Sequence, residues 1–191
     1  MMTTRIGYKL FRVKKNSPGK LFPLYVLSND EMPMDKWLIA KCGDMIDGKV
    51  KSKLGPLKYR PGFHINDKAP YVSHIGIKED GIIKYMHSDT VWCEVEYISD
   101  TDYNMEAEEC GWNSEHTKFS EKNACLNRIP ENGFYYYKTS PQMTGRWIIS
   151  GEMKINRILS DVEVEELCLK SGIRALPRKD DFDFKAYGFV S

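Results

Sequence analysis

Apolar and polar residues alternate along several short stretches of this chain, which is the pattern of β-strands that bury one face. The clearest stretch covers residues 91–98. Its two faces carry Val91, Cys93, Val95 and Tyr97 on one side, and Trp92, Glu94, Glu96 and Ile98 on the other. Further strands are predicted at residues 8–13, 21–27, 63–65 and 134–137. Residues 146–159 predict a long strand or a hairpin, with a bend at Gly151. Because strands outnumber helices, we predict an α+β fold of mainly antiparallel, twisted sheets with short helices.

One helix has sequence signals at both ends. Ser160 and Glu163 have the spacing of a capping box, in which each side chain accepts a hydrogen bond from the backbone amide of the other residue. Gly172 stands where a glycine commonly follows a helix. We therefore predict a helix over residues 161–171.

The length of 191 residues favours a single domain over residues 1–191. Residues 99–132 are polar and predict a long, irregular insertion, of the kind in which partners often bind. Residues 42–58 are rich in glycine and lysine and predict a basic surface loop. From about residue 177, aspartate alternates with phenylalanine, and we expect an arm that lies on the surface.

Composition argues against several classes of protein. With 28 basic and 27 acidic residues the net charge is +1, which provides no general attraction to nucleic acid or membrane. No apolar run approaches the roughly 20 residues of a membrane helix, and residues 1–5 lead into a strand without a signal-peptide core. We expect a cytoplasmic protein with no membrane partner.

The five cysteines are widely spaced and include no CxxC pair, so a disulfide framework is not expected. Cys110, His116 and Cys125 lie in one polar segment and could share a metal ion. Their spacing matches no zinc pattern, however, and we predict free thiols and no metal site.

Three residues are candidates for catalysis. His64 follows a Pro-Gly turn and could serve as a general base. The favoured interpretation is that His64 holds the turn by a hydrogen bond. Glu94 and Glu96 share a strand face about 7 Å apart and could act together on a cation or a sugar. A solvated strand face explains the same two carboxylates.

Two arginines and an aromatic stretch are candidates for binding. Arg12 and Arg60 could grip a phosphate, although each fits a surface ion pair equally well. The tyrosines of residues 135–137, with Arg146 nearby, and the basic loop could hold single-stranded RNA, with at most alternate tyrosines free. The predicted partner-binding residues are Lys49, Lys51, Lys53, Lys58, Tyr136 and Arg146.

The order of four segments resembles a widespread group of small, uncharacterised phage and prophage proteins. These segments are residues 8–13, 60–64, 91–96 and 147–155, and the resemblance covers roughly residues 8 to 160. It implies a phage or mobile-element origin and carries no activity.

A more distant likeness is to the ADP-ribosyltransferase fold, a split β-sandwich that holds NAD in its cleft. Arg12 corresponds to the arginine or histidine of the family's first strand, and residues 62–66 are similar to the start of its second core strand, without the Ser/Thr expected there. Gly145 and Arg146 stand where the family has its catalytic glutamate. The group that would stabilise positive charge on the ribose is therefore missing at that position.

Two functional hypotheses follow. The first is an accessory protein without catalytic residues or cofactor, which binds a host protein or ribonucleoprotein and inhibits a nucleic-acid-targeting defence such as a CRISPR effector. The alternative is an NAD-dependent, ADP-ribosyltransferase-like enzyme. In that enzyme Arg12 and His64 would hold the dinucleotide, and Glu94 or Glu96 would supply the carboxylate.

Overall fold

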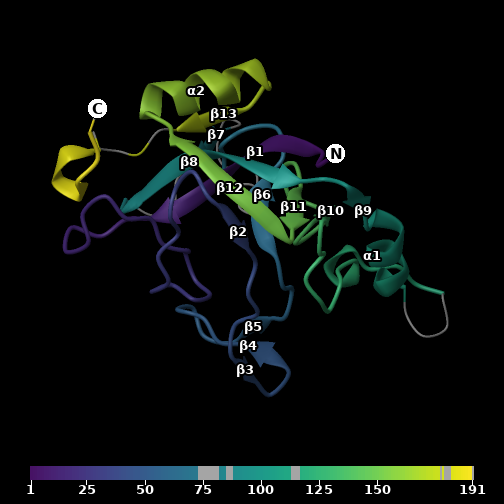
Figure 1. Cartoon of the computed structure of the whole chain (residues 1–191). Helices are drawn as coiled ribbons and strands as arrows, with labels where there is room; N and C mark the ends of the chain where they lie inside the picture. The colour runs from purple at the N-terminus through teal and green to yellow at the C-terminus, as the bar shows by residue number, and fades with distance from the viewer. Residues whose placement is uncertain (73–81, 85–87, 113–116, 177, 179–181, 191) are drawn as a thin grey trace.

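A computed structural model of the chain describes residues 1–72, 82–84, 88–112, 117–176, 178 and 182–190. Its main element is an eight-stranded sheet with the order β2-β12-β8-β1-β6-β11-β10-β9 (Figure 1). The strands are β1 (Thr4–Arg12), β2 (Trp37–Ile39), β6 (Phe63–Asn66), β8 (Thr90–Ile98), β9 (Thr101–Asp102), β10 (Gly133–Tyr137), β11 (Trp147–Ser150) and β12 (Glu152–Ile158). All neighbouring pairs are antiparallel except β9 and β10. The predicted α+β architecture with a mainly antiparallel sheet is confirmed.

The main sheet is strongly curved. Only Gly151 separates β11 from β12 along the chain, yet β6, β1 and β8 lie between these two strands in the sheet. Since neighbouring strands are about 4.8 Å apart, a flat sheet could not bring the two strand ends so close. A Cβ atom at Gly151 would lie 2.5 Å from the carbonyl oxygen of Pro130, so the predicted bend lies at a position that only glycine fits.

The sheet has two halves that meet at one residue pair. β1 pairs with β8 over nine positions, from Thr4 opposite Ile98 to Arg12 opposite Thr90, but with β6 only through Tyr8 opposite Asn66. We call the face that carries Phe11, Val95 and Ile148 the inner face, because the main core gathers on it. The opposite face is the outer face.

The predicted strand over residues 91–98 is confirmed as β8. The side chains of Val91, Cys93, Val95 and Tyr97 lie in the main core on the inner face, where residues from β6, β10, β11 and β12 also contribute. On the outer face, Trp92 packs in a second cluster beneath α2 (Asp161–Lys170), and Tyr135 packs in a third cluster beneath α1 (Asn104–Gly111). Each half of the sheet is therefore covered on its outer side by a different helix.

Helix α2 has the predicted ends. The capping box is present, with the amide of Glu163 donating to Ser160 Oγ at 3.2 Å and the amide of Ser160 donating to Glu163 Oε2 at 2.9 Å. After the helix, the amide of Ile173 donates to the carbonyl of Cys168, and the amide of Gly172 donates to that of Leu169. This pair of bonds is the Schellman arrangement.

Three expectations from the sequence differ from the structure. Residues 42–58 are not one loop, because β3 (Met45–Ile46), β4 (Lys49–Val50) and β5 (Leu57–Lys58) form a small antiparallel sheet. The two-residue turn between β3 and β4 is Asp47-Gly48, with φ values of 49° and 73°, as in a tight hairpin. The strand predicted at residues 21–27 is reduced to one bridge, Phe22 to Arg12, since Pro23 has no amide hydrogen to continue the ladder. Residues 99–132 contain β9, α1 and η1 (Glu121–Asn123).

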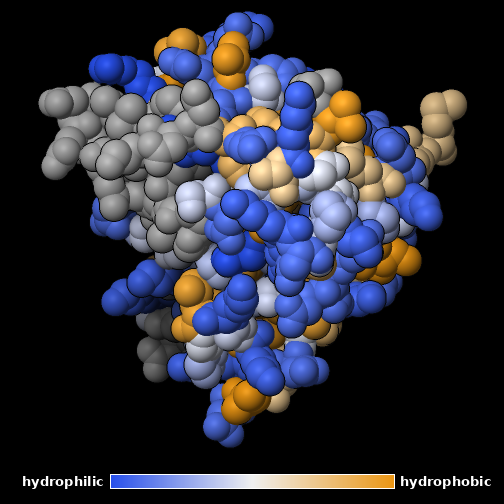
Figure 2. All heavy atoms as spheres, turned by 90° about the vertical axis from the view of Figure 1, so that its left-hand side faces the viewer, coloured by the Kyte–Doolittle hydropathy of each residue, from blue (hydrophilic) through white to orange (hydrophobic). Residues whose placement is uncertain are grey.

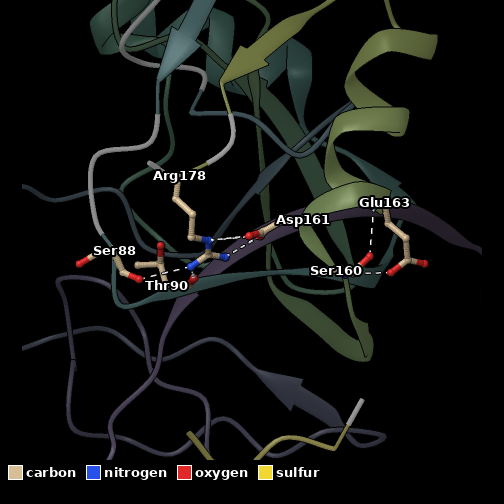
Figure 3. A network of polar contacts seen from close by, with 6 residues as sticks. All are labelled: Ser88, Thr90, Ser160, Asp161, Glu163 and Arg178. Carbon is tan, nitrogen blue, oxygen red and sulfur yellow. Dashed lines mark hydrogen bonds and ion pairs between the residues drawn. The ribbon is translucent and has the colours of Figure 1, made fainter. Parts of the chain in front are cut away.

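The C-terminal segment lies against the body of the protein. Phe189 is buried in the main core, and Phe182, Phe184 and Tyr187 pack against it; residues 185–187 form η2 (Lys185–Tyr187). Arg178 holds the segment through Asp161 and the carbonyl oxygens of Ser88 and Thr90 (Figure 3). A further pair of short strands, β7 (Ile82–Lys84) and β13 (Arg174–Leu176), runs parallel.

Outside the atoms drawn in grey, the face in Figure 2 is mainly hydrophilic. Blue, hydrophilic side chains cover most of this face, and orange, apolar ones stand in small separate groups. Among the described residues, no helix is long and apolar enough to cross a membrane.

Candidate functional site

Two arginines meet at one tyrosine at the end of the inner face. Tyr136 comes from β10, Arg146 directly precedes β11, and Arg5 lies on β1. The guanidinium carbon of Arg146 lies 3.3 Å from the centroid of the Tyr136 ring. Arg5 Nη1 donates to the Tyr136 hydroxyl at 3.5 Å, and its guanidinium lies 5.0 Å from the centroid of the Phe134 ring. We call Arg5, Tyr136 and Arg146 the arginine–tyrosine cluster.

The position of Arg146 is set by contacts from another part of the chain. Its Nε donates to Asp67 Oδ2 at 2.8 Å, from the residue that follows β6. The preceding Gly145 has a φ of 77°, and a Cβ atom there would lie 1.5 Å from the hydroxyl of Tyr71. Both the left-handed backbone and the close tyrosine require glycine at this position. Burial, helped by the negative charge of Asp67, raises the pKa of Tyr71 to about 12, so the tyrosine is neutral.

The cluster carries excess positive charge. Arg5 is exposed and forms no ion pair with a carboxylate in the part of the chain that the structure describes. Among the described residues, Asp67 forms its ion pair with Arg146 and with no other cation, and the Arg146 side chain remains 42% exposed. Guanidinium groups of this kind bind phosphate through paired hydrogen bonds and offer flat surfaces on which a base can stack.

Side chains alternate between the two faces of the sheet along β10, and this determines which tyrosine can contact a partner. Tyr135 and Tyr137 point to the outer face and are buried, whereas Tyr136 is half-buried on the inner face. The hydroxyl of Tyr137 accepts a hydrogen bond from Arg60 Nη1, and the Arg60 guanidinium stacks 4.7 Å from the Tyr137 ring centroid. Arg60 is therefore occupied by an internal contact.

The four predicted lysines form a separate basic surface. Lys49, Lys51, Lys53 and Lys58 lie on or beside the small sheet, which Figure 1 shows below the main sheet. Lys49 stands directly opposite Lys58 in the β4–β5 pair. Lys58 Nζ donates to Asn123 Oδ1 at 2.7 Å and to the carbonyl oxygen of Lys122. Within the described chain, none of the four forms a hydrogen bond or ion pair with the arginine–tyrosine cluster.

The two carboxylates of β8 are bound to cations of β12. Glu96 Oε2 lies 2.5 Å from Lys154 Nζ, directly across the strand pair, and Thr4 Oγ1 donates to Glu96 Oε1 at 3.1 Å. The hydrogen bond from Lys154 is the main cause that lowers the pKa of Glu96. Glu94 Oε2 lies 3.4 Å from Arg157 Nη2. Both carboxylates thus belong to cross-strand ion pairs.

His64 makes the contact expected of a turn-holding histidine. Its Nδ1 lies 3.2 Å from the carbonyl oxygen of Gly62, and its ring meets Trp147 edge-on with centroids 5.9 Å apart. Burial, with the nearby charges of Lys9 and Arg60, lowers the pKa of His64 to about 3. The ring is therefore neutral near pH 7, and no carboxylate among the described residues pairs with it.

Arg12 and His64 have different neighbours. Arg12 lies at the end of β1, where Nη1 is 3.4 Å from Asp89 Oδ2 and Nη2 is 3.4 Å from the carbonyl oxygen of Leu24. No hydrogen bond joins Arg12 to His64, Glu94 or Glu96 in the described structure. The residues proposed for the NAD-dependent alternative are thus each engaged in a different local contact.

Sequence reasoning missed Arg5, Lys9 and Asp67. Nothing in the sequence marks Arg5 or Asp67, because their roles depend on strands that are distant along the chain. Lys9 does carry a signal, since it alternates with Phe11 and Val13 on the face that becomes buried. A charged residue on an apolar strand face predicts a polar partner in the fold, because lysine is rarely buried unpaired.

No group of three or more histidine, cysteine or acidic residues that could hold a metal ion occurs among the described residues; His116 lies outside them. Comparison of the chain with models of known families, with curated proteins and with solved structures finds no match.

Proposed function

We propose that this protein acts by binding, as an accessory protein of a phage or mobile element that inhibits a host nucleic-acid-targeting defence such as a CRISPR effector. The stack of Arg146 on Tyr136, with Arg5 at the same tyrosine, carries the proposal. The partner is a host ribonucleoprotein, and the cluster contacts its RNA.

The chemistry of the cluster matches a single strand of RNA. Two guanidinium groups can hold neighbouring phosphates, and the exposed side of the Arg146 guanidinium offers a plane for an unpaired base. Asp67 offsets only one of the two positive charges. Because the whole chain has a net charge of +1, attraction to RNA has to come from a local group of this kind.

The lysines of the small sheet supply a second contact in this proposal. Like charges directly opposite one another, such as Lys49 and Lys58, destabilise a strand pair, and an anionic partner would offset that repulsion. Lys51 and Lys53 are both exposed beside the pair.

The ion pairs of Glu94 and Glu96 favour binding over catalysis. A carboxylate that stabilises a developing positive charge has to face the reacting atoms, and these two face Arg157 and Lys154 instead. The NAD-dependent alternative and the split β-sandwich of the ADP-ribosyltransferases remain predictions. Measured transfer of label from NAD to protein or nucleic acid would favour that alternative.

The direct test measures binding of fluorescein-labelled single-stranded RNA of about twelve nucleotides, long enough to cover one binding groove, by fluorescence anisotropy. The double variant Arg5→Ala, Arg146→Ala should bind at least tenfold more weakly. For this variant, the slope of log Kd against the logarithm of the salt concentration should be smaller by about 1.4. This is the change expected for two lost phosphate contacts on a single strand.

Arg128→Ala is the matched control. Arg128 also stacks on a tyrosine, Tyr103, and pairs with a carboxylate, Glu106, but it lies outside the cluster. This variant should bind RNA as the native chain does. Equal affinity of the native chain and the Arg5, Arg146 double variant would refute the assigned site.

The host complex is tested by capture from host extract with and without ribonuclease. A ribonucleoprotein should be retained by the native chain, and ribonuclease or the double variant should release it. Retention of the same complex after both treatments would show that protein contacts, rather than the cluster, provide the binding.

A further inference from the structure

β2 is an edge strand of the main sheet and pairs on one side only, with β12. The amide of Ala40 donates to the carbonyl oxygen of Gly151, which continues this ladder just beyond the strand. Main-chain groups of successive residues alternate between the two sides of a strand, so Leu38 bonds to β12 as Ala40 does. Trp37 and Ile39 therefore direct their amides and carbonyls away from the sheet. No other segment of the described chain pairs with this edge.

The two residues with outward main-chain groups also expose apolar side chains. Trp37 is 36% exposed and Ile39 is 71% exposed. Both side chains lie on the outer face, because Leu38 between them packs against the main core on the inner face. Lys154 stands opposite Trp37 on β12, and its ammonium lies 5.4 Å from the centroid of the indole. The edge thus offers unused hydrogen bonds and apolar surface at the same two residues.

Opposite charges flank β2. Asp35 lies in the turn before the strand, Lys41 follows the strand, and both residues are exposed. Neither side chain forms an ion pair within the described part of the chain. An antiparallel strand of the same sequence would bring the start of one copy beside the end of the other. Asp35 of each copy would then meet Lys41 of the other, so the edge is complementary to itself in charge.

One antiparallel register of two β2 strands suits both the main chain and the side chains. With Leu38 opposite Leu38 of the second copy, Trp37 of each copy stands opposite Ile39 of the other. These are hydrogen-bonded pairs, because their main-chain groups point outward, and they supply about four hydrogen bonds. A shift of two residues in one direction places Asp35 opposite Ile39. The same shift in the other direction places Lys41 opposite Trp37, so both alternatives set a charge against an apolar side chain.

We propose that two copies of this chain form a symmetric dimer by pairing their β2 strands in the register that sets Leu38 opposite Leu38. The main sheet then continues from one copy into the other, as in strand addition to an exposed sheet edge. Because β2 has only three residues, the dimer belongs to the weak class of interfaces, which bury less than about 1,200 Å². The arginine–tyrosine cluster lies on other strands, so the dimer does not depend on the proposed RNA contact.

The first test is sedimentation equilibrium of the full chain from about 1 µM to about 1 mM, a range that covers weak association. The average mass should rise from that of one chain toward that of two and no further, because an isologous contact closes on itself. Ile39→Pro removes the outward amide but keeps the bonds of Leu38 to β12, and proline is tolerated on edge strands. This variant should dimerise at least tenfold more weakly, with a melting temperature close to that of the native chain.

Charge variants test the register. Lys41→Asp sets an aspartate against Asp35 at both ends of the contact, and Asp35→Lys sets a lysine against Lys41 at both ends. Each variant alone should dimerise about tenfold more weakly than the native chain. An equimolar mixture of the two variants, with one of them fluorescently labelled, should form a heterodimer of near-native affinity, because opposite charges then meet at both ends. The Arg5→Ala, Arg146→Ala variant should dimerise as the native chain does.

Three results would overturn the proposal. One is a native chain that remains monomeric at about 1 mM. Another is self-association that Ile39→Pro leaves unchanged, which would place the contact on a different surface. The third is a mixture of Lys41→Asp and Asp35→Lys that associates no more tightly than either variant alone. That result would exclude the antiparallel register even if Ile39→Pro lowered the affinity.

Discussion

Lys9 donates a hydrogen bond from its ammonium group to the main-chain carbonyl oxygen of His64, at 2.8 Å. The bond joins β1 to β6 next to the single position, Tyr8 opposite Asn66, at which these strands pair. It therefore helps to hold the two halves of the sheet together. Its cost is the partial removal of a charged amine from water, and burial lowers the pKa of Lys9 to about 8.

The stability of the protein should rise between pH 8 and pH 10.5 through Lys9. The folded-state pKa lies below the value of an unfolded lysine, so the unfolded chain binds more protons in this range, and raising the pH favours folding. Because the side chain keeps partial contact with water, we expect a gain of about 2 kcal/mol. Urea unfolding of the native chain and of Lys9→Met across this range measures it. Parallel pH profiles for the two proteins would contradict the assignment.

Acid should weaken the fold through His64. Its folded-state pKa of about 3 lies below the ordinary value of 6.5, so the unfolded chain takes up the proton first, and stability falls as the pH drops below 6.5. His64→Gln keeps a polar side chain but cannot gain this charge. Its urea midpoint should change less between pH 7 and pH 4 than that of the native chain. An equally steep fall in both proteins would assign the acid sensitivity to other groups.

Gly145→Ala should destabilise the fold by about 2–4 kcal/mol, from the left-handed backbone and the overlap with the Tyr71 hydroxyl. It should also weaken RNA binding, because Arg146 is the next residue. Adding Tyr71→Phe removes the hydroxyl, and in the double variant part of the lost stability should return. Strictly additive effects in denaturant unfolding would show that the two residues do not interact.

Arg178→Met should cost about 3 kcal/mol in the free energy of unfolding. The Arg178 side chain is 6% exposed, and its loss removes the ion pair with Asp161 and the hydrogen bond to the carbonyl oxygen of Thr90. Proteolysis within the C-terminal segment should become faster, since Phe182 and Phe189 lose their anchor. Arg128→Met, which breaks an exposed ion pair, should have a much smaller effect. Similar losses in both variants would contradict the anchoring role.

Local patterns were sufficient for several elements. The alternation of residues 91–98 predicted β8 and its buried face, because a strand with one face in the core has a period of two. Ser160 and Glu163 predicted the start of α2, because a capping box is made within four residues. Asp47-Gly48 is a typical hairpin turn, but the strands beside it are only two residues long, so residues 42–58 have the sequence pattern of a loop.

The sites depended on contacts between distant segments. The sequence predicted Tyr136 and Arg146 as binding residues, and residues 134–137 as a strand in which at most alternate tyrosines are free. Only the tertiary structure stacked Arg146 on Tyr136, brought Arg5 beside them and paired Glu94 and Glu96 with β12. Periodicity determines which face of a strand is buried, but the order of strands in the sheet determines what that face meets. That order arises from long-range pairing, such as Tyr8 with Asn66, which no local pattern encodes.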